Sequence, residues 1–307
     1  LTGLISSLLT AAEKGKGTII LAYTHGQPAQ PTTWGHYLGA FIEILQRDVE
    51  RITVARSSSE LCSMGAAAIT TTGFNLDRKR MSDLLGFAAP LENSYGCISI
   101  VDYVTGLYSA LKVMFLNMGR FIQDLAQRSA FEVGHIYVPN EFVQISSIMP
   151  QKRNPVPIEH MRLIASLSSG HCDTIINTMH NTPFTDMNDS ETEVQRAGHQ
   201  AFESGSRLLL LLTDFINVVQ IDEEKVMKDI GKSCATITEV ADSIARIEGV
   251  SFKIAHEIAG DMAKRVTADE ITLEDFVYKE FQDIYRDHTG METNITIEKL
   301  KEIGSPD

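Results

Sequence analysis

Apolar residues recur at helical spacing over most of the chain. From residue 38 onward every third or fourth position is apolar and charged or amide side chains lie between: Leu38, Phe41, Leu45, Val49, Ile52. The same spacing continues from 101 to 128, and we expect further helices at about 157–179 and 197–219. Four long amphipathic helices with little strand-like alternation predict an all-α fold, a long-helix bundle.

The helical pattern becomes shorter after residue 221. Asp222 suits the start of a new helix, and three short helical segments follow at 235–248, 252–265 and 272–288. Ser251 and Thr272 each precede an apolar-periodic run, so we expect both to cap helices. The change predicts two domains, a central bundle over 1–221 and a small C-terminal helical domain over 222–307.

Two segments break the helical rhythm. The first, 23–33, contains two prolines and a glycine directly before a long helix. The second, 134–157, contains four prolines and a polar run, and its last two prolines, Pro155 and Pro157, suit the first turn of the helix that follows. Long irregular segments inside a compact domain tend to carry function.

The second of these segments concentrates polar chemistry. Within Ser146–Pro155 lie two hydroxyls, two cations and an amide, a set that suits binding of a carboxylate. A solvated, proline-stiffened surface loop explains the same composition. In the first segment, a lone histidine such as His25 is more often structural than catalytic. Trp34 and His36 are expected to pack at the start of the helix.

The composition of the chain limits the kinds of ligand, cofactor and cellular location that we expect. The chain has 27 Lys and Arg against 40 Asp and Glu, a net charge of −13, and this charge argues against nucleic acid as a binding partner. The 4 cysteines lie singly with no paired spacing, so neither a disulfide framework nor a zinc site is expected and a reducing cytoplasm is the natural location. No apolar run approaches the length of a membrane span, and the start of the chain does not read as an export signal. No phosphate-binding glycine loop is present, so no nucleotide, flavin or metal cofactor is expected.

Together the two irregular segments resemble the fumarase/aspartase superfamily, in particular its argininosuccinate lyase branch. Thr24-His25-Gly26-Gln27-Pro28-Ala29-Gln30-Pro31 is similar to that branch's YTHxQxAQP segment. Ser146–Pro155 is similar to the superfamily signature SSxMPxKxNP. The resemblance implies an all-α homotetramer whose long helices form a common bundle and whose active sites are shared between subunits. It also implies a longer protein with a further N-terminal domain.

Members of this family release fumarate by β-elimination, and the resemblance assigns roles to the residues. It implies Ser146 as the general base and His25 as the second acid/base group, oriented by Glu159. Further residues are implied to bind the succinyl end of the substrate: Thr24, Gln27, Lys152, Asn154. An elimination next to a carboxylate builds up negative charge, so cations and hydrogen-bond donors are the residue types it needs.

Two departures from the family pattern bear on the substrate. Ile145 stands where most members have a glycine before the two serines. After Pro183, an ungapped comparison places Asp186, Glu191 and Val194 where argininosuccinate lyases resemble one another in a tyrosine, a glutamine and a lysine. The first expectation is therefore a lyase acting on argininosuccinate or another N-succinyl amine. An adenylosuccinate lyase-like or aspartase-like enzyme and a non-catalytic scaffold relative remain possible readings of the same sequence.

Overall fold

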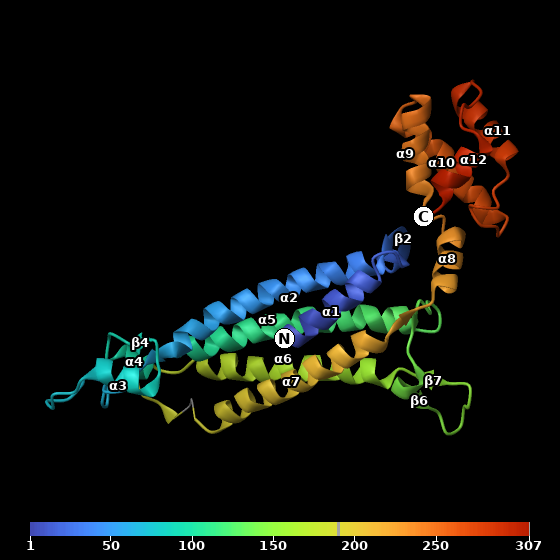
Figure 1. The fold of residues 1–307 in the computed structure, drawn as a ribbon. Coiled ribbons are helices and arrows are strands. Elements are labelled where there is room, and N and C mark those ends of the chain that lie inside the picture. The colour runs from blue at the N-terminus through green and yellow to red at the C-terminus, as the bar shows by residue number, and fades with distance from the viewer. Residues whose placement is uncertain (189–190, 307) are drawn as a thin grey trace. The chain divides into compact units, whose positions relative to one another are not determined.

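The computed structural model describes residues 1–188 and 191–306 and is dominated by helices (Figure 1). The helices are α1 (Thr2–Lys14), α2 (Trp34–Ser57), α3 (Arg78–Leu85), α4 (Gly96–Ser99), α5 (Asp102–Ser129), α6 (Val156–Met179), α7 (Glu193–Val218), α8 (Glu223–Lys232), α9 (Ile237–Glu248), α10 (Phe252–Ala268), α11 (Tyr278–Thr289) and α12 (Ile297–Gly304). The all-α long-helix bundle predicted from the spacing is confirmed. Over the described part of the chain, none of the helices combines the length and apolarity needed to cross a bilayer.

Short strands form two-stranded ladders between the helices. They are β1 (Ile19–Thr24) with β2 (Gln27–Thr33), β3 (Leu61–Cys62) with β4 (Ala89–Pro90), β5 (Ile136–Tyr137) with β8 (Gln220–Ile221), and β6 (Gln144–Ile145) with β7 (Arg153–Asn154). The segment at 23–33, expected as irregular, is therefore largely a hairpin, and 134–157 holds three short strands. The prolines in both segments argued against strands, but proline is tolerated at the exposed edge of a two-stranded ladder.

The contacts divide the chain into two compact units. The bundle unit comprises residues 1–9, 40–127 and 138–218. The hairpin unit comprises residues 10–39, 128–137 and 219–307 and contains the β1–β2 hairpin and the helices from α8 onward.

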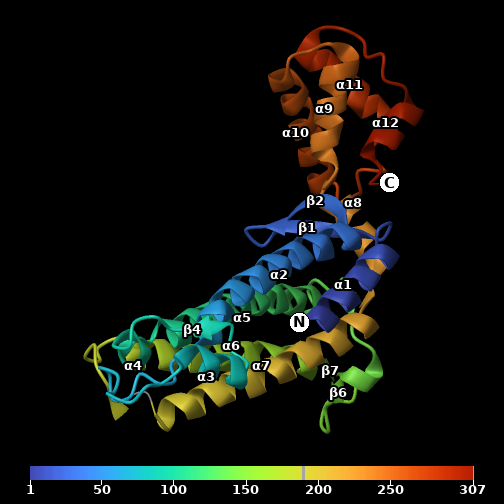
Figure 2. The ribbon, with the colours of Figure 1, turned by 60° about the vertical axis from the view of Figure 1, so that its left-hand side comes forward.

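Long helices run side by side in the bundle unit, where α6 packs along α7 (Figure 2). The rings of Phe41 on α2 and Phe121 on α5 stack with centroids 3.9 Å apart. Asp48, completely buried on α2, accepts hydrogen bonds from the Asn117 amide of α5 at 3.1 and 3.3 Å and pairs with Arg51. A buried carboxylate needs such partners, so this contact fixes where the two helices meet.

Two glycines of α7 receive aromatic side chains of α5. A Cβ atom at Gly205 would lie 2.5 Å from a ring carbon of Phe115, and one at Gly198 would overlap the Tyr108 hydroxyl. Only a residue without a side chain leaves room for these rings. The two glycines and the two aromatic residues are each seven positions apart, so the contact repeats every two helical turns.

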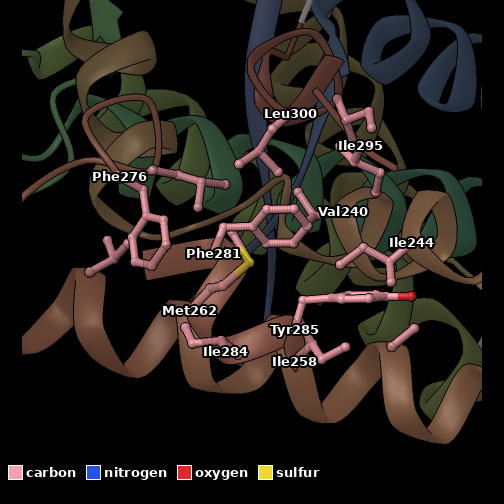
Figure 3. Packing of buried hydrophobic residues seen from close by; sticks show 14 of the residues in the cluster. Val240, Ile244, Ile258, Met262, Phe276, Phe281, Ile284, Tyr285, Ile295 and Leu300 are labelled. Atoms are coloured by element: carbon pink, nitrogen blue, oxygen red, sulfur yellow. The ribbon is translucent and has the colours of Figure 1, made fainter. Parts of the chain in front are cut away.

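The C-terminal helices of the hairpin unit enclose their own core. Phe281 and Tyr285 of α11 lie against Val240 and Ile244 of α9 and Met262 of α10 (Figure 3). Ser251 caps α10 as expected, because its hydroxyl accepts from the Ile254 amide at 3.4 Å. A second core in this unit joins Leu21 of β1 to Val226 and Ile230 of α8 and so holds the hairpin against that helix.

One expected cap is wrong. Thr272 does not begin a helix, because α11 starts only at Tyr278. The Thr272 hydroxyl instead accepts from the Asp275 amide at 3.3 Å and closes a turn. Asp222 does cap α8, since its carboxylate accepts from the Lys225 amide at 3.0 Å, and Pro155 and Pro157 do stand at the start of α6.

Candidate active site

The tip of the β1–β2 hairpin brings three of the predicted site residues together. Thr24 pairs with Gln27 across the hairpin, so His25 and Gly26 form a two-residue turn. Both have positive φ, 54° for His25 and 74° for Gly26. This backbone conformation is typical of two-residue hairpin turns, because its twist matches that of the flanking strands. Thr24, His25 and Gln27 are all exposed.

His25 is unusual in this conformation. Left-handed backbone is uncommon for a residue other than glycine, and such strain tends to persist where the surroundings hold it and where function uses it. The turn places the imidazole at the tip of the hairpin, directly after Thr24 in the chain. The two-residue turn itself requires this backbone, so a catalytic role of His25 stays a prediction.

A buried cation lies behind this turn. Arg128, at the end of α5, is 5% exposed, and its Nη1 donates to the Leu21 carbonyl at 3.0 Å. The guanidinium carbon lies 5.7 Å from the ring centroid of Tyr23 and 4.8 Å from that of Tyr37. Arg128 is not among the residues predicted from the sequence, because an arginine in the last turn of a helix is ordinary.

His135 also lies near Tyr23. Its ring centroid is 5.9 Å from that of Tyr23, and its Nε2 is 3.0 Å from a carboxylate oxygen of Asp229. The Lys225 amine donates to the same oxygen at 2.6 Å. Burial lowers the pKa of His135, even though Asp229 acts in the opposite direction. Hydrogen bonds from Lys225 and His135 lower the pKa of Asp229 against the opposing effect of burial, so Asp229 stays ionised.

The second predicted group lies on a hairpin of the bundle unit. Gln144 pairs with Asn154 and Ile145 with Arg153, which leaves residues 146–152 as the connecting loop. Arg153 anchors this hairpin by donating to the Val138 carbonyl at 2.9 Å and to the Asn140 side chain at 2.7 Å. Arg153, the second cation of the motif, thus donates hydrogen bonds to groups of the protein itself.

Ser146 begins the connecting loop. Its Oγ accepts from the amides of Ile148 at 3.3 Å and Met149 at 3.0 Å. Backbone donors directed at this oxygen stabilise negative charge on it, which is what an alkoxide base requires. Lys152 is exposed and Asn154 half-buried. The ladder therefore places Ser146 and Asn154 at opposite ends of one short hairpin.

Glu159 is exposed in the first turn of α6, five residues after Asn154. Like the 144–154 hairpin it belongs to the bundle unit, whereas Thr24, His25 and Gln27 belong to the hairpin unit. The pairing of His25 with Glu159 stays a prediction.

The segment after Pro183 is only partly open to a ligand. Asp186 and Glu191 are exposed, but Val194 is 6% exposed and packs with Ile175 and Met179. The valine is thus mostly buried in the bundle unit, and it lines a small pocket together with Asp186. The Tyr95 hydroxyl donates to the Phe184 carbonyl at 3.1 Å and fixes the start of the segment.

Comparison with known proteins supplies the family. A family model described as lyase matches residues 1–168, and one described as argininosuccinate lyase C-terminal matches residues 234–306. The chain is 56% identical to argininosuccinate lyase 2 of Agrobacterium fabrum over 99% of its own length and 60% of the relative's. It is 30% identical to argininosuccinate lyase of Methanococcus maripaludis, covering 88% of the chain and 56% of the relative.

Solved structures agree with these relatives. An EDDS lyase variant with bound fumarate superposes with a TM-score of 0.89 at 25% identity, covering 99% of this chain and 60% of that one. Class II fumarase from Schistosoma mansoni superposes with a TM-score of 0.76 at 17% identity, a likeness of fold, covering 99% of this chain and 64% of that one. The chain thus spans about 60% of the length of its relatives. It belongs to this lyase family, the fumarase/aspartase superfamily, and is argininosuccinate lyase-like.

Proposed function

We propose that the protein of which this chain is part is a carbon–nitrogen lyase that releases fumarate from an N-succinyl amine, with argininosuccinate as the first candidate substrate. The observation that carries the proposal is the oxygen of Ser146, which accepts two backbone amides at the start of the signature loop. The 56% identity to an argininosuccinate lyase supports the same reaction.

The proposed reaction begins at the succinyl group. Ser146, as an alkoxide, takes a proton from the carbon next to one carboxylate, and the electron pair moves into that carboxylate to give a doubly charged aci-carboxylate. Lys152 and Asn154 bind the succinyl carboxylates and stabilise the added charge. Thr24 and Gln27 bind the same end of the substrate.

The second step breaks the carbon–nitrogen bond. The electron pair returns from the aci-carboxylate to form the double bond of fumarate, and the bonding pair of the breaking bond leaves with the nitrogen. His25, oriented by Glu159, donates the proton that the departing amine takes up. The substrate is then converted to fumarate and a free amine, and the enzyme is restored when Ser146 loses its proton to solvent and His25 takes one up, with no oxidant or cofactor required.

We propose further that the enzyme is a homotetramer with active sites shared between subunits. Large apolar side chains are exposed on three long helices of the bundle unit: Val113, Leu116, Leu163, Leu167, Phe202, Leu210. A groove of about 630 Å³ along α5 and α6 is lined by Leu116, Arg120 and Arg162 among others. An apolar surface of this kind suits association with further copies. A cytoplasmic location, which suits four unpaired cysteines, is part of the proposal. So is a domain boundary at residue 222, although the compact unit that contains 219–307 also takes in residues 10–39 and 128–137.

The segment after Pro183 favours a second candidate substrate. In an ungapped comparison two acidic residues and a buried valine stand where the branch carries a tyrosine, a glutamine and a lysine, a difference that would suit a leaving amine with a charge or shape other than that of arginine. EDDS, named by the structural relative, is a substrate to test for this reason. Adenylosuccinate and aspartate test for an adenylosuccinate lyase-like and an aspartase-like activity.

The test is fumarate release by the full-length protein, followed by ultraviolet absorbance with argininosuccinate, EDDS, adenylosuccinate and aspartate in parallel. Release from argininosuccinate supports the first candidate. Release from another compound alone supports the reaction and assigns specificity to residues 183–194. Absence of release from all four, in a protein shown to be folded and assembled, contradicts the proposal and favours a non-catalytic relative.

A further inference from the structure

Arg128 connects β1 with the start of α2 and the end of α5, the parts of these two helices that belong to the hairpin unit. It extends from the end of α5, lies over the ring of Tyr37 in the first turn of α2, and lies near the ring of Tyr23 in β1. A guanidinium can do this because it is planar, is attracted to aromatic faces and still donates hydrogen bonds from its edge. Here the donor Nη1 bonds to the carbonyl of Leu21, two residues before Tyr23.

Tyr23 is the last residue of β1 before the turn whose side chain packs against buried residues. The ladder register shifts between Leu21, which lies opposite Pro31, and Tyr23, which lies opposite Pro28, so the regular pairing of β1 with β2 is interrupted just before Tyr23. The extra residue lies on β2, and a bulge of this kind bends the bulged strand and increases the local twist of the hairpin, including the turn beyond it. The orientation of the turn therefore depends on contacts of Tyr23 as well as on backbone pairing.

Those contacts come from two further parts of the chain. Arg128 approaches from the end of α5, and His135, 1% exposed and bonded to Asp229, approaches from the segment before β5. Both side chains are almost fully buried, so neither is explained by solubility. Burying an arginine side chain is unfavourable unless hydrogen bonds and other polar contacts compensate for the lost hydration.

We propose that Arg128 is a positioning residue for the candidate active site: by fixing Tyr23 it holds the turn of Thr24, His25, Gly26 and Gln27 in its left-handed geometry. His25 has a backbone conformation that it does not prefer, and surrounding contacts must maintain such a conformation. The catalytic part of this inference rests on the proposed function. The structural part does not.

The experiment uses the full-length protein and two readouts. In Arg128→Met, amide hydrogen exchange of peptides covering 22–30 should rise at least about tenfold, while peptides from α10 and α11 keep their wild-type rates. With the best substrate from the fumarate assay, kcat should fall about 10- to 100-fold and KM should change less than about threefold, because a misplaced group slows the reaction more than it weakens binding.

A double-mutant cycle tests whether Arg128 acts through Tyr23. Tyr23→Leu should reproduce both effects, Tyr23→Phe should leave them near wild type because the ring remains, and the double variant Arg128→Met/Tyr23→Leu should be no worse than the poorer single variant. Arg128→Lys, which keeps the charge and loses the planar group, should recover part of kcat. Arg246→Met is the matched control, since Arg246 is exposed in the same unit and pairs with Glu239 on its own helix.

Three results overturn the inference. They are unchanged exchange at 22–30 in Arg128→Met, additive losses in the double variant, and an equal effect of Arg246→Met. If Arg128→Met does not fold, Arg128→Lys and Tyr23→Leu decide by the same readouts. If the wild type releases no fumarate from any substrate, the proposed function fails, and the exchange data alone then decide whether Arg128 holds the turn.

Discussion

At the scale of single residues, the two candidate hairpins differ in how their chemistry is held. His25 depends on a strained backbone, whereas Ser146 depends on hydrogen bonds from its own loop. The serine oxygen therefore keeps its surroundings even when a side chain is altered elsewhere in the loop. This makes Ser146 the cleaner residue for a test of catalysis.

Ser146→Ala should lower fumarate release by about 10²- to 10⁴-fold, the range for loss of a general acid or base. The exposed Ser147 next to it is the matched control, and Ser147→Ala should change the rate much less. Light scattering should give the wild-type mass for both variants. A Ser146→Ala enzyme that works at full rate would show that another group is the base.

The buried His135, paired with the half-buried Asp229, predicts a dependence of stability on pH. The pKa of His135 is lower in the folded protein than in the unfolded chain, chiefly because of burial, so the unfolded state binds more protons as the pH falls through about 6.5. The free energy of unfolding should therefore decrease between pH 7.5 and pH 5.5. Arg128, Lys225, Asp229 and Tyr23 are the charged or titratable groups around it.

The measurement is the melting temperature of wild type and His135→Gln at the two pH values. Glutamine retains a donor for Asp229 and does not titrate, so the variant should lose less stability on acidification than the wild type. A variant with the same pH dependence as the wild type would place the effect on other groups.

At the scale of elements, the long helices could be predicted and the hairpins could not. The spacing of Leu38, Phe41 and Leu45 is a local signal that tertiary contacts reinforce, and α2 indeed extends over it. The β1–β2 hairpin has no such signal, because Pro28 and Pro31 suggest a loop and the type of turn depends on His25 adopting positive φ. Thr272 failed as a cap because a threonine can close a turn as well as a helix.

The residues around the turn also show what could not be predicted from the sequence. Thr24, His25 and Gln27 could be proposed from a motif, but Arg128 lies 104 positions after Thr24 in the chain and only the fold brings its guanidinium to Tyr23. Sequence reasoning can find a contiguous motif more readily than the distant residues that hold it.

The end of α9 offers a test of element stability. One carboxylate oxygen of Glu248 accepts from the Thr293 hydroxyl at 2.6 Å and from the Asn294 and Ile295 amides at 2.7 and 3.1 Å. These hydrogen bonds lower the pKa of Glu248 against the opposing effect of burial. Glu248→Gln should destabilise the C-terminal helices by about 1–3 kcal/mol, since amide donors lose a charged acceptor.

Urea unfolding of the full-length protein, followed by hydrogen exchange in α11 and α12, measures this effect. Glu302→Gln serves as the control, because Glu302 is exposed and pairs only within α12 among the ion pairs described. Equal stability of the Glu248 and Glu302 variants would mean that the cluster of hydrogen bonds contributes little.

At the scale of the whole molecule, the exposed apolar residues of the long helices predict assembly. Leu163→Arg and Leu210→Arg each replace an exposed apolar side chain of a long helix by a charge, so each should shift the proposed tetramer toward smaller species. Leu84→Arg is the control. Leu84 is also an exposed leucine, 76% exposed, but it lies on the short helix α3 and not on one of the long helices. Size-exclusion chromatography with light scattering measures the mass.

If the sites are shared between subunits, fumarate release should fall together with the tetramer fraction and recover at higher protein concentration. Full activity from a stable monomer would contradict both the shared sites and the role given to this surface. A Leu84→Arg protein that also dissociates would mean that the loss is not specific to the long helices.

The seven-residue repeat of glycines on α7 limits how the gene for this protein can change. Inserting one residue between Gly198 and Gly205 would rotate the second glycine by about 100° around the helix, away from the ring of Phe115. Substitutions elsewhere on the helix leave that alignment intact. Length variation among descendants of this sequence should therefore accumulate in the connections between helices, while the stretch from 198 to 205 keeps a constant number of codons.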